Sequence, residues 1–355
     1  MSWFGQINRC VTNQENLPRF RMRIAVGVFI ILCLAAQLLY FQSISRPPEV
    51  LLNIAFDAAR PALTPLDLAW SAISDQRVYS IHAGSTHQTE ALATGLIADT
   101  ICVSSPGELD RLSQLAGGLV DPNWRAHFPE NSSPFTSSIV FIVRPSARGA
   151  IEDWPDLFKP NWRIAVPDPR ISGAGQYAYL GLIYSADQSV GTDPLKLAAA
   201  LRSIHFIPHA ASQSSSVFQR DTEFDALLTW ESEALRLMQN SANHEFAIIY
   251  PSQSIKIEAV VAIADSQVDR RGTRDAAEDY LKFFFSPEGQ SIIEQAGFRP
   301  RKPQATSLHP HGENRLHSVE TLFGSWEKAQ ELHLGTNGSF TRLLEYRKAR
   351  SGGTE

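Results

Sequence analysis

The stretch IAVPDPRISGAGQYAYLGLIY, residues 164–184, carries the clearest signal for the fold of this chain. It begins with a short apolar run of strand length, passes through a turn of proline and small polar residues, and continues as an apolar segment of helical length. Ser172 stands at the N-cap position, where a serine oxygen can accept a hydrogen bond from a free backbone N–H. The stretch therefore predicts a strand that leads through a polar turn into a helix.

The same alternation continues on both sides of this stretch. From Pro47-Pro48 onward, short apolar runs alternate with helical patterns, which predicts an α/β fold with mainly parallel strands. Two long extended stretches, residues 136–144 and 249–263, suit crossings between two lobes. The expected strands are residues 51–56, 78–82, 100–103, 138–143, 163–166, 205–208, 226–229, 246–250 and 259–263. The expected helices include one capped by Thr273 that runs through residue 285, one capped by Ser286 that ends near residue 297, and a last one over residues 318–333.

Length and composition restrict the class of protein. The chain of 355 residues is 43% hydrophobic, so it can bury a sizeable core as one large domain or two lobes. Its net charge of −5, with both signs interspersed, provides no basic surface for nucleic acid. Cys10 and Cys33 lie near the N-terminus, so Cys102 is the one cysteine of the body, and no disulfide is expected within it.

An uncharged apolar run over residues 24–41 follows three arginines and predicts an export segment. The run is longer than the usual core of a signal peptide and slightly shorter than a membrane-spanning helix. Residues 22–45 are therefore interpreted as either a signal peptide or a signal anchor that contacts the membrane through residues 24–41. Residues 1–21 are a cytoplasmic n-region, or they precede the true start if translation begins at Met22.

Cleavage of the export segment stays open. Ser43 and Ser45 provide small residues for a cut before Arg46. The body is expected in the periplasm in either case, soluble after cleavage or tethered to the inner membrane by the N-terminal helix.

Four junctions between expected strands and helices share small or polar residues. They are Phe56-Asp57-Ala58, Ala83-Gly84-Ser85, Ile171-Ser172-Gly173-Ala174 and His209-Ala210-Ala211-Ser212. The first turn of a helix leaves backbone N–H groups without intrahelical partners, and the helix dipole adds about half a positive charge there. Each junction is therefore a potential anion site, but for any one of them ordinary capping is the simpler interpretation, and the four form a site only if the fold brings them together.

No motif for catalysis is found. The chain lacks HExxH, GxSxG and GxxxxGK[ST], and its histidines are scattered without the spacing of metal ligands. Residues 173–178 read GAGQYA, a near match to the dinucleotide fingerprint, but no acidic residue follows at the required distance. We therefore expect no enzyme activity, no cofactor and no metal.

Several ordered motifs of the body resemble the bacterial periplasmic sulfate-binding and thiosulfate-binding proteins of ABC importers. The resemblance covers nearly the whole body, and the ordered set of motifs is more specific than any one of them. The motifs are LLNIAFDAAR from residue 51, HAGSTHQTEALATGLIAD from 82, PFTSSIVFIVR from 134, DWPDLFKPNWRIAVPDPRISGAGQYAYLGLIY from 153, LLTWESEAL from 227, YLKFFFSPEGQ from 280, GFRPR from 297 and LFGSWEKAQELH from 322.

The resemblance implies a ligand site made of neutral hydrogen-bond donors. Two side chains are implied, the Ser172 hydroxyl and the Trp230 indole N–H, and without the resemblance Trp230 is more simply interpreted as a core aromatic. A lining of donors alone suits sulfate, because hydrogenphosphate carries a proton that needs an acceptor. The implied backbone N–H donors are those of Asp57, Ser85, Gly173, Ala174 and Ala211.

The chain departs from the family pattern in its anion loops. The second lobe's GARG-like loop is Ala210-Ala211-Ser212-Gln213 here, so Ser212 replaces a basic side chain. In the first loop, Ala83, Thr86 and His87 replace two glycines and a lysine. Weaker affinity or a broader range of oxyanions is compatible with these changes.

The resemblance implies a two-lobed periplasmic-binding-protein fold, type II-like, in which each lobe is a mainly parallel sheet with flanking helices, preceded by an N-terminal hydrophobic helix. The expected divisions are residues 46–137 and 251–316 for lobe I, 138–250 for lobe II and 317–355 for a C-terminal helix and tail. The expected function is capture of sulfate or thiosulfate by a monomer and delivery to an ABC transporter permease. Binding of molybdate or phosphate, and a membrane-anchored oxyanion sensor or interaction protein, remain alternatives.

Overall fold

The computed structural model describes residues 31–35, 37, 50–186, 193–209, 211–240, 246–301 and 315–350. The chain divides into two compact units, residues 1–48 and 49–355. In the first unit the described residues 31–35 and 37 are helical. In the described part of the chain, no helix is long and apolar enough to cross a membrane. The rest of the expected export segment lies outside the described residues.

The second unit contains the strands β1 to β11 and the helices α2 to α15. The strands are β1 (Val50–Phe56), β2 (Arg77–Ala83), β3 (Thr100–Val103), β4 (Phe135–Val143), β5 (Ile164–Pro167), β6 (Ile204–Ile207), β7 (Ala226–Trp230), β8 (Ala247–Ile249), β9 (Gln253–Ile263), β10 (Arg299–Pro300) and β11 (Arg315–His317). The α-helices are α2 (Arg60–Ile73), α3 (Ser85–Ala93), α4 (Pro106–Leu115), α5 (Pro129–Ser132), α6 (Gly173–Ser185), α7 (Pro194–Ala200), α8 (Ala211–Arg220), α9 (Glu231–Asn240), α10 (Asp265–Arg271), α11 (Arg274–Phe283), α12 (Pro287–Gln295), α13 (Val319–Phe323), α14 (Trp326–Ala329) and α15 (Ser339–Arg350). Short 3-10 turns are η1 (Asp57–Ala59), η2 (Trp124–Ala126), η3 (Pro145–Ala147) and η4 (Trp154–Phe158), and residues Gln330–Leu334 form a π-helical turn.

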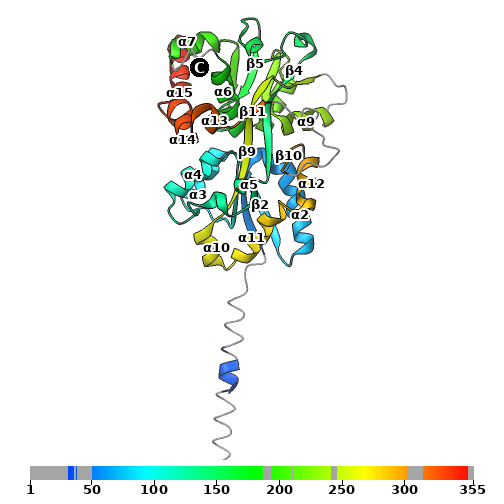
Figure 1. The fold of residues 1–355 in the computed structure, drawn as a ribbon, viewed down its shortest axis with the longest axis vertical. Coiled ribbons are helices and arrows are strands. Elements are labelled where there is room, and N and C mark those ends of the chain that lie inside the picture. The colour runs from blue at the N-terminus through cyan, green and yellow to red at the C-terminus, as the bar shows by residue number, and fades with distance from the viewer. Residues whose placement is uncertain are drawn as a thin grey trace, which may run out of the picture. The chain divides into compact units, whose positions relative to one another are not determined.

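The sheet runs in the order β2-β1-β3-β9-β4-β7-β5-β6. The neighbours β1, β2 and β3 are parallel, as are β5, β6 and β7. The long strands β4 and β9 pair antiparallel with each other and join these two parallel groups. In Figure 1, β4 and β9 run lengthwise between helices α2, α3, α4, α10, α11 and α12 at one end and α6, α7 and α15 at the other. The antiparallel pairs all involve β4 or β9, so the parallel pattern holds within each group.

The hydrophobic core follows the two groups of strands. Ile101, Val103 and Leu109 belong to a cluster that packs β3 against α4, and Phe218, Leu227 and Leu237 belong to one that packs α8 and α9 against β7. A larger cluster continues through β4, β9 and α6. Side chains on both faces of the crossing strands are therefore buried, and β4 is buried at every residue.

The expected α/β fold is confirmed, and each expected strand is present with ends that differ by a few residues. Ser286 caps α12 by accepting a hydrogen bond from the Gly289 N–H at 3.0 Å, as expected. The stretch 249–263 is two strands, because the chain leaves β8 at Ile249 and enters β9 at Gln253.

The prediction of a single helix over residues 318–333 was wrong. Gly324 adopts a positive φ of 85° and ends α13, after which Ser325 caps α14. The apolar positions that suggested one helix are therefore shared between short helices that meet at a turn. The following helix, α15, was missed, and it packs against α7.

Asp99 joins three segments at the edge of the first group of strands. Its side chain is fully buried and accepts hydrogen bonds from the Leu52 N–H at 2.7 Å and from the Arg271 Nε at 2.9 Å. The Thr273 hydroxyl also donates to it, so the expected cap residue of α11 binds this carboxylate in place of its own helix. Asp99 therefore links β1 to the turn between α10 and α11.

We expect Asp99→Ala to lower the free energy of unfolding by about 3–5 kcal/mol, because it leaves the partly buried Arg271 without its charged partner. The matched control is Asp269→Ala, which removes a solvent-exposed partner of Arg274 from the same region and is expected to leave stability nearly unchanged. Urea unfolding followed by circular dichroism measures both. Equal effects of the two substitutions would contradict the role given to Asp99.

Candidate anion-binding site

The four strand-to-helix junctions that the sequence predicts are present in the structure. Strand β1 leads into η1, β2 into α3, β5 through a turn into α6, and β6 into α8. Helix α8 packs against both η1 and α6, so helix N-termini from the two groups of strands meet. Unpaired N–H groups of several first turns are therefore brought to one place.

A small cavity lies at this meeting point. Its volume is about 20 Å³, above the roughly 10–15 Å³ that one water molecule requires, so it holds only a small group. It is lined by Phe56, Asp57, Ala58, Gly84, Ser104, Ile171, Ser172, Gly173, Ala174 and Trp230.

The structure brings together most of the site residues expected from the sequence. Asp57, Ser172, Gly173, Ala174 and Trp230 line the cavity directly. Ser85 and Ala211 are the first residues of α3 and α8. Their backbone N–H groups are among those that a helix leaves without intrahelical partners.

The turn before α6 is held in shape by Asp168. The Asp168 side chain accepts from the Arg170 N–H at 2.8 Å, and its carbonyl accepts from the Ser172 N–H at 3.0 Å. The Ser172 oxygen in turn accepts from the Gly175 N–H at 3.3 Å and caps the helix. A serine hydroxyl that accepts one hydrogen bond retains its own proton to donate, so capping and ligand binding are compatible at Ser172.

Trp230 is fixed at the end of β7 by other aromatic rings. Its ring lies 5.3 Å from that of Phe56, 6.2 Å from that of Tyr177 and 6.3 Å from that of Phe298, measured between centroids. The side chain is 1% exposed, and its indole N–H has no hydrogen-bond partner. A buried donor without a partner is costly, so this N–H next to a cavity indicates a polar ligand.

The cavity carries little formal charge. Among the described lining residues, Asp57 is the one with an ionisable side chain, and no lysine or arginine is present. The Ser212 hydroxyl donates to the Asp57 carboxylate, so the residue that replaces a basic side chain in this loop contacts the opposite loop. Burial lowers the pKa of His82 nearby, and the charge of Arg60 lowers it further, which favours neutral His82.

Sequence reasoning did not single out Phe56, Ala58, Gly84, Ser104 and Ile171 as site residues. Phe56, Ala58, Gly84 and Ile171 belong to junctions that the sequence did identify. Ser104 follows β3 and precedes α4, so the same strand-to-helix pattern at Val103-Ser104-Ser105 was the available signal.

Gly84, in the loop after β2, lies close to Ile171, in the loop after β5. A Cβ atom at this position would lie 2.6 Å from the carbonyl oxygen of Ile171, nearer than real Cβ atoms approach. Glycine therefore permits the loop after β2 to contact the loop after β5, which closes the cavity.

Comparison with known proteins shows which family the chain resembles. Residues 51–299 match a family model described as bacterial extracellular solute-binding protein. The chain is 31% identical to the sulfate-binding protein of Escherichia coli K12, over 82% of this chain and 92% of that protein. It is 32% identical to the thiosulfate-binding protein of Pseudomonas aeruginosa, over 83% of this chain and 92% of that protein.

A solved structure shows the same fold. The sulfate-binding protein SubI from Mycobacterium tuberculosis H37Rv superposes with a TM-score of 0.67, over 79% of this chain and 98% of SubI, at 24% sequence identity. At this identity the likeness supports the two-lobed fold and nothing about the ligand.

We expect Gly84→Ala to separate the loops after β2 and β5, because the added methyl group cannot occupy the space beside the Ile171 carbonyl. Amide hydrogen exchange in the first turns of α3 and α6 should then become faster. Gly117→Ala is the matched control, since a Cβ atom there meets nothing within 4 Å. If exchange in these turns is the same in both variants, the loops are not in contact in solution.

Proposed function

The chain belongs to the bacterial extracellular solute-binding proteins, and from that premise we propose that it captures sulfate or thiosulfate in the cavity between its strand-to-helix junctions. The proposed ligand contacts are the backbone N–H groups of the four junctions, the Ser172 hydroxyl and the Trp230 indole. The residues concerned are Asp57, Ser85, Ser172, Gly173, Ala174, Ala211 and Trp230.

The observation that carries the proposal is the buried Trp230 N–H without a partner beside the small cavity. A small tetrahedral anion matches the donors that face the cavity. Hydrogen bonds to a charged group contribute about 1.5–3 kcal/mol each, so a set of such donors can offset the desolvation of a dianion. No charged lysine or arginine is needed in the described lining for this mode of binding.

The proposal extends to a role in uptake. We infer that the two groups of strands act as lobes, with residues 46–137 and 251–316 in one and 138–250 in the other, and that their closed form delivers the anion to an ABC-type permease. The ligand is transported unchanged, so no catalytic role is proposed.

The proposed location of the protein is the periplasm, with residues 22–45 acting as a signal peptide or as an anchor. N-terminal sequencing of the mature protein distinguishes these, since a chain that begins near Arg46 excludes an anchor.

The Asp57 carboxylate favours phosphate as an alternative ligand. It belongs to the cavity lining, and a carboxylate can accept the proton that hydrogenphosphate carries. The Ser212 hydroxyl already donates to this carboxylate, which reduces its capacity to accept another hydrogen bond. We therefore place phosphate second to sulfate.

We expect Trp230→Phe to weaken sulfate binding by about 1.5–3 kcal/mol, because phenylalanine retains the ring packing but lacks the donor. Trp162→Phe is a matched control, since the Trp162 indole N–H is also buried without a partner but lies outside the cavity lining. Isothermal titration calorimetry with sulfate measures both variants. Unchanged affinity in Trp230→Phe would reassign Trp230 to the core alone.

The same calorimetry with thiosulfate, molybdate and phosphate tests the choice of ligand. Tightest binding of phosphate would support the alternative based on Asp57. The absence of heat with all of these anions would contradict the proposed function as a whole.

A further inference from the structure

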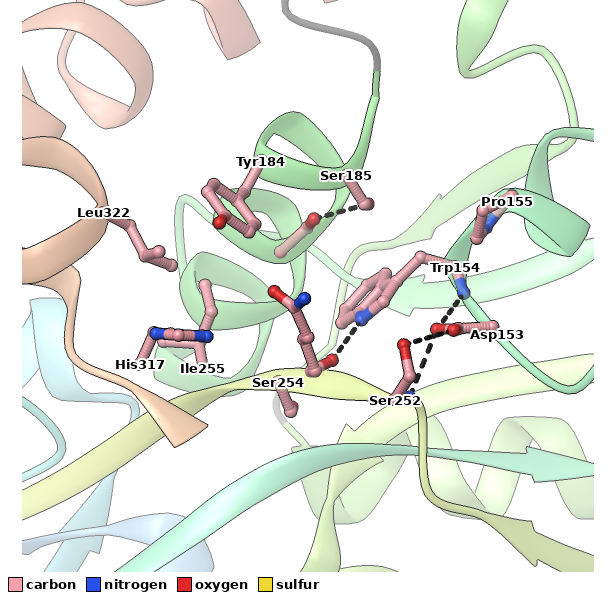
Figure 2. A pocket seen from close by; sticks show the side chains of 12 residues that line it. Asp153, Trp154, Pro155, Tyr184, Ser185, Ser252, Ser254, Ile255, His317 and Leu322 are labelled. Carbon is pink, nitrogen blue, oxygen red and sulfur yellow. Dashed lines mark hydrogen bonds between the residues drawn. The ribbon is translucent and has the colours of Figure 1, made fainter. Parts of the chain in front are cut away.

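A second cavity, separate from the anion site, lies where η4, the C-terminal end of α6 and the paired strands β9 and β11 meet. Its volume is about 180 Å³, and none of its described lining residues lines the anion cavity. Figure 2 shows Trp154 and Ser185 on one side of it and Tyr184, Leu322 and His317 on the other. A cavity of about 150 Å³ lined by apolar side chains can hold a benzene molecule, so this one has room for a single ring.

The Trp154 wall is fixed before any ligand arrives. The indole N–H donates to the Gln253 carbonyl at 2.7 Å, and the ring meets Phe141 edge-on with 5.0 Å between centroids. Gly181 lets this ring lie directly against α6, because a Cβ atom there would collide with it. A wall that is already held in place reduces the entropy lost on binding.

Asp153, at the edge of this cavity, has its carboxylate occupied. It accepts from the Trp154 N–H at 2.8 Å, from the Ser252 N–H at 3.3 Å and from the Ser252 hydroxyl, as Figure 2 shows. No lysine or arginine is in the described lining. The cavity therefore favours a neutral ligand over a charged one.

His317 provides a polar group in the lining of the cavity. Pairing of β11 with β9 places His317 opposite Ile255, and its ring centroid lies 6.4 Å from that of Tyr184. The His317 Nε2 atom is buried and has no hydrogen-bond partner. A ligand that pairs with this atom would remove the cost of leaving it unsatisfied.

We propose that this cavity is a second ligand site, which binds a neutral molecule with one aromatic ring and a single hydroxyl group. The ring lies between Trp154 and Tyr184, and the hydroxyl forms a hydrogen bond with His317 Nε2. Tyr184, 40% exposed, forms the entrance. The site is independent of sulfate binding and does not rest on the proposed function.

The test uses 4-fluorophenol and 4-fluorotoluene, which differ mainly in the hydroxyl group, titrated into the purified full-length chain and followed by fluorine NMR. We expect saturable binding of 4-fluorophenol at one site, at least fivefold tighter than that of 4-fluorotoluene. His317→Leu should abolish this preference. Tyr184→Ala should weaken 4-fluorophenol binding at least tenfold, whereas Tyr79→Ala, which removes an exposed tyrosine of β2, should leave it unchanged.

Leu322→Trp provides a second variant. The larger side chain fills the cavity from the wall opposite Trp154 and should abolish 4-fluorophenol binding. Sulfate titration of each variant separates local effects from misfolding, because none of these residues lines the anion cavity. The proposal is overturned if 4-fluorophenol does not saturate, if the Tyr184 and Tyr79 variants bind it equally, or if tetramethylammonium displaces it, which would indicate a site for cations. Failure of sulfate binding alone would contradict the proposed function and leave this site standing.

Discussion

The antiparallel pairing of β4 with β9 determines where the functional elements of the body lie. Thr136 pairs with Glu258 and Ser138 with Lys256, while the other parts of the same two strands pair with β7 and with β3. Each group of parallel strands then directs its carboxyl ends, and the helices that follow them, toward the same cavity. In open α/β sheets the carboxyl ends of strands are where ligands bind, and here two groups of parallel strands contribute such ends to one place.

An anion can be bound in two ways, by cationic side chains or by neutral hydrogen-bond donors, and the two differ in the cost of desolvation. A lysine or arginine must itself be desolvated when a site closes, which offsets much of its attraction for the ligand. Backbone N–H groups at helix termini are held in place by the helix and carry only partial charge, so their desolvation costs less. The proposed site follows the second approach, with the Trp230 indole as a proposed donor that packs against the surrounding rings.

Local features of the fold were predictable from the sequence, and distant relations were not. The strands and the caps at Ser172 and Ser286 follow from hydrophobic pattern and from the first turn of a helix, which depend on neighbouring residues. The convergence of four junctions depends on pairing between strands far apart in the chain, so periodicity alone left each junction an ordinary cap. Gly324 was missed as a helix end, although a glycine followed by a capping serine is a local signal for the end of one helix and the start of another. Contact between Ser212 and Asp57 also joins loops far apart in sequence.

The hydrogen bond from Ser212 to Asp57 shows what changes when serine replaces a basic side chain at position 212. A basic residue at position 212 would place a positive charge beside the Asp57 carboxylate, whereas Ser212 offers one neutral hydrogen bond. The attraction between the two loops across the cavity is then weaker and less sensitive to salt, since a hydroxyl carries no net charge. In the proposed mechanism, closure then depends more on the close approach of Gly84 to Ile171 and on the ligand itself, which would supply acceptors to donors from both sides. In such an arrangement the anion contributes a larger part of the free energy that holds the two loops together.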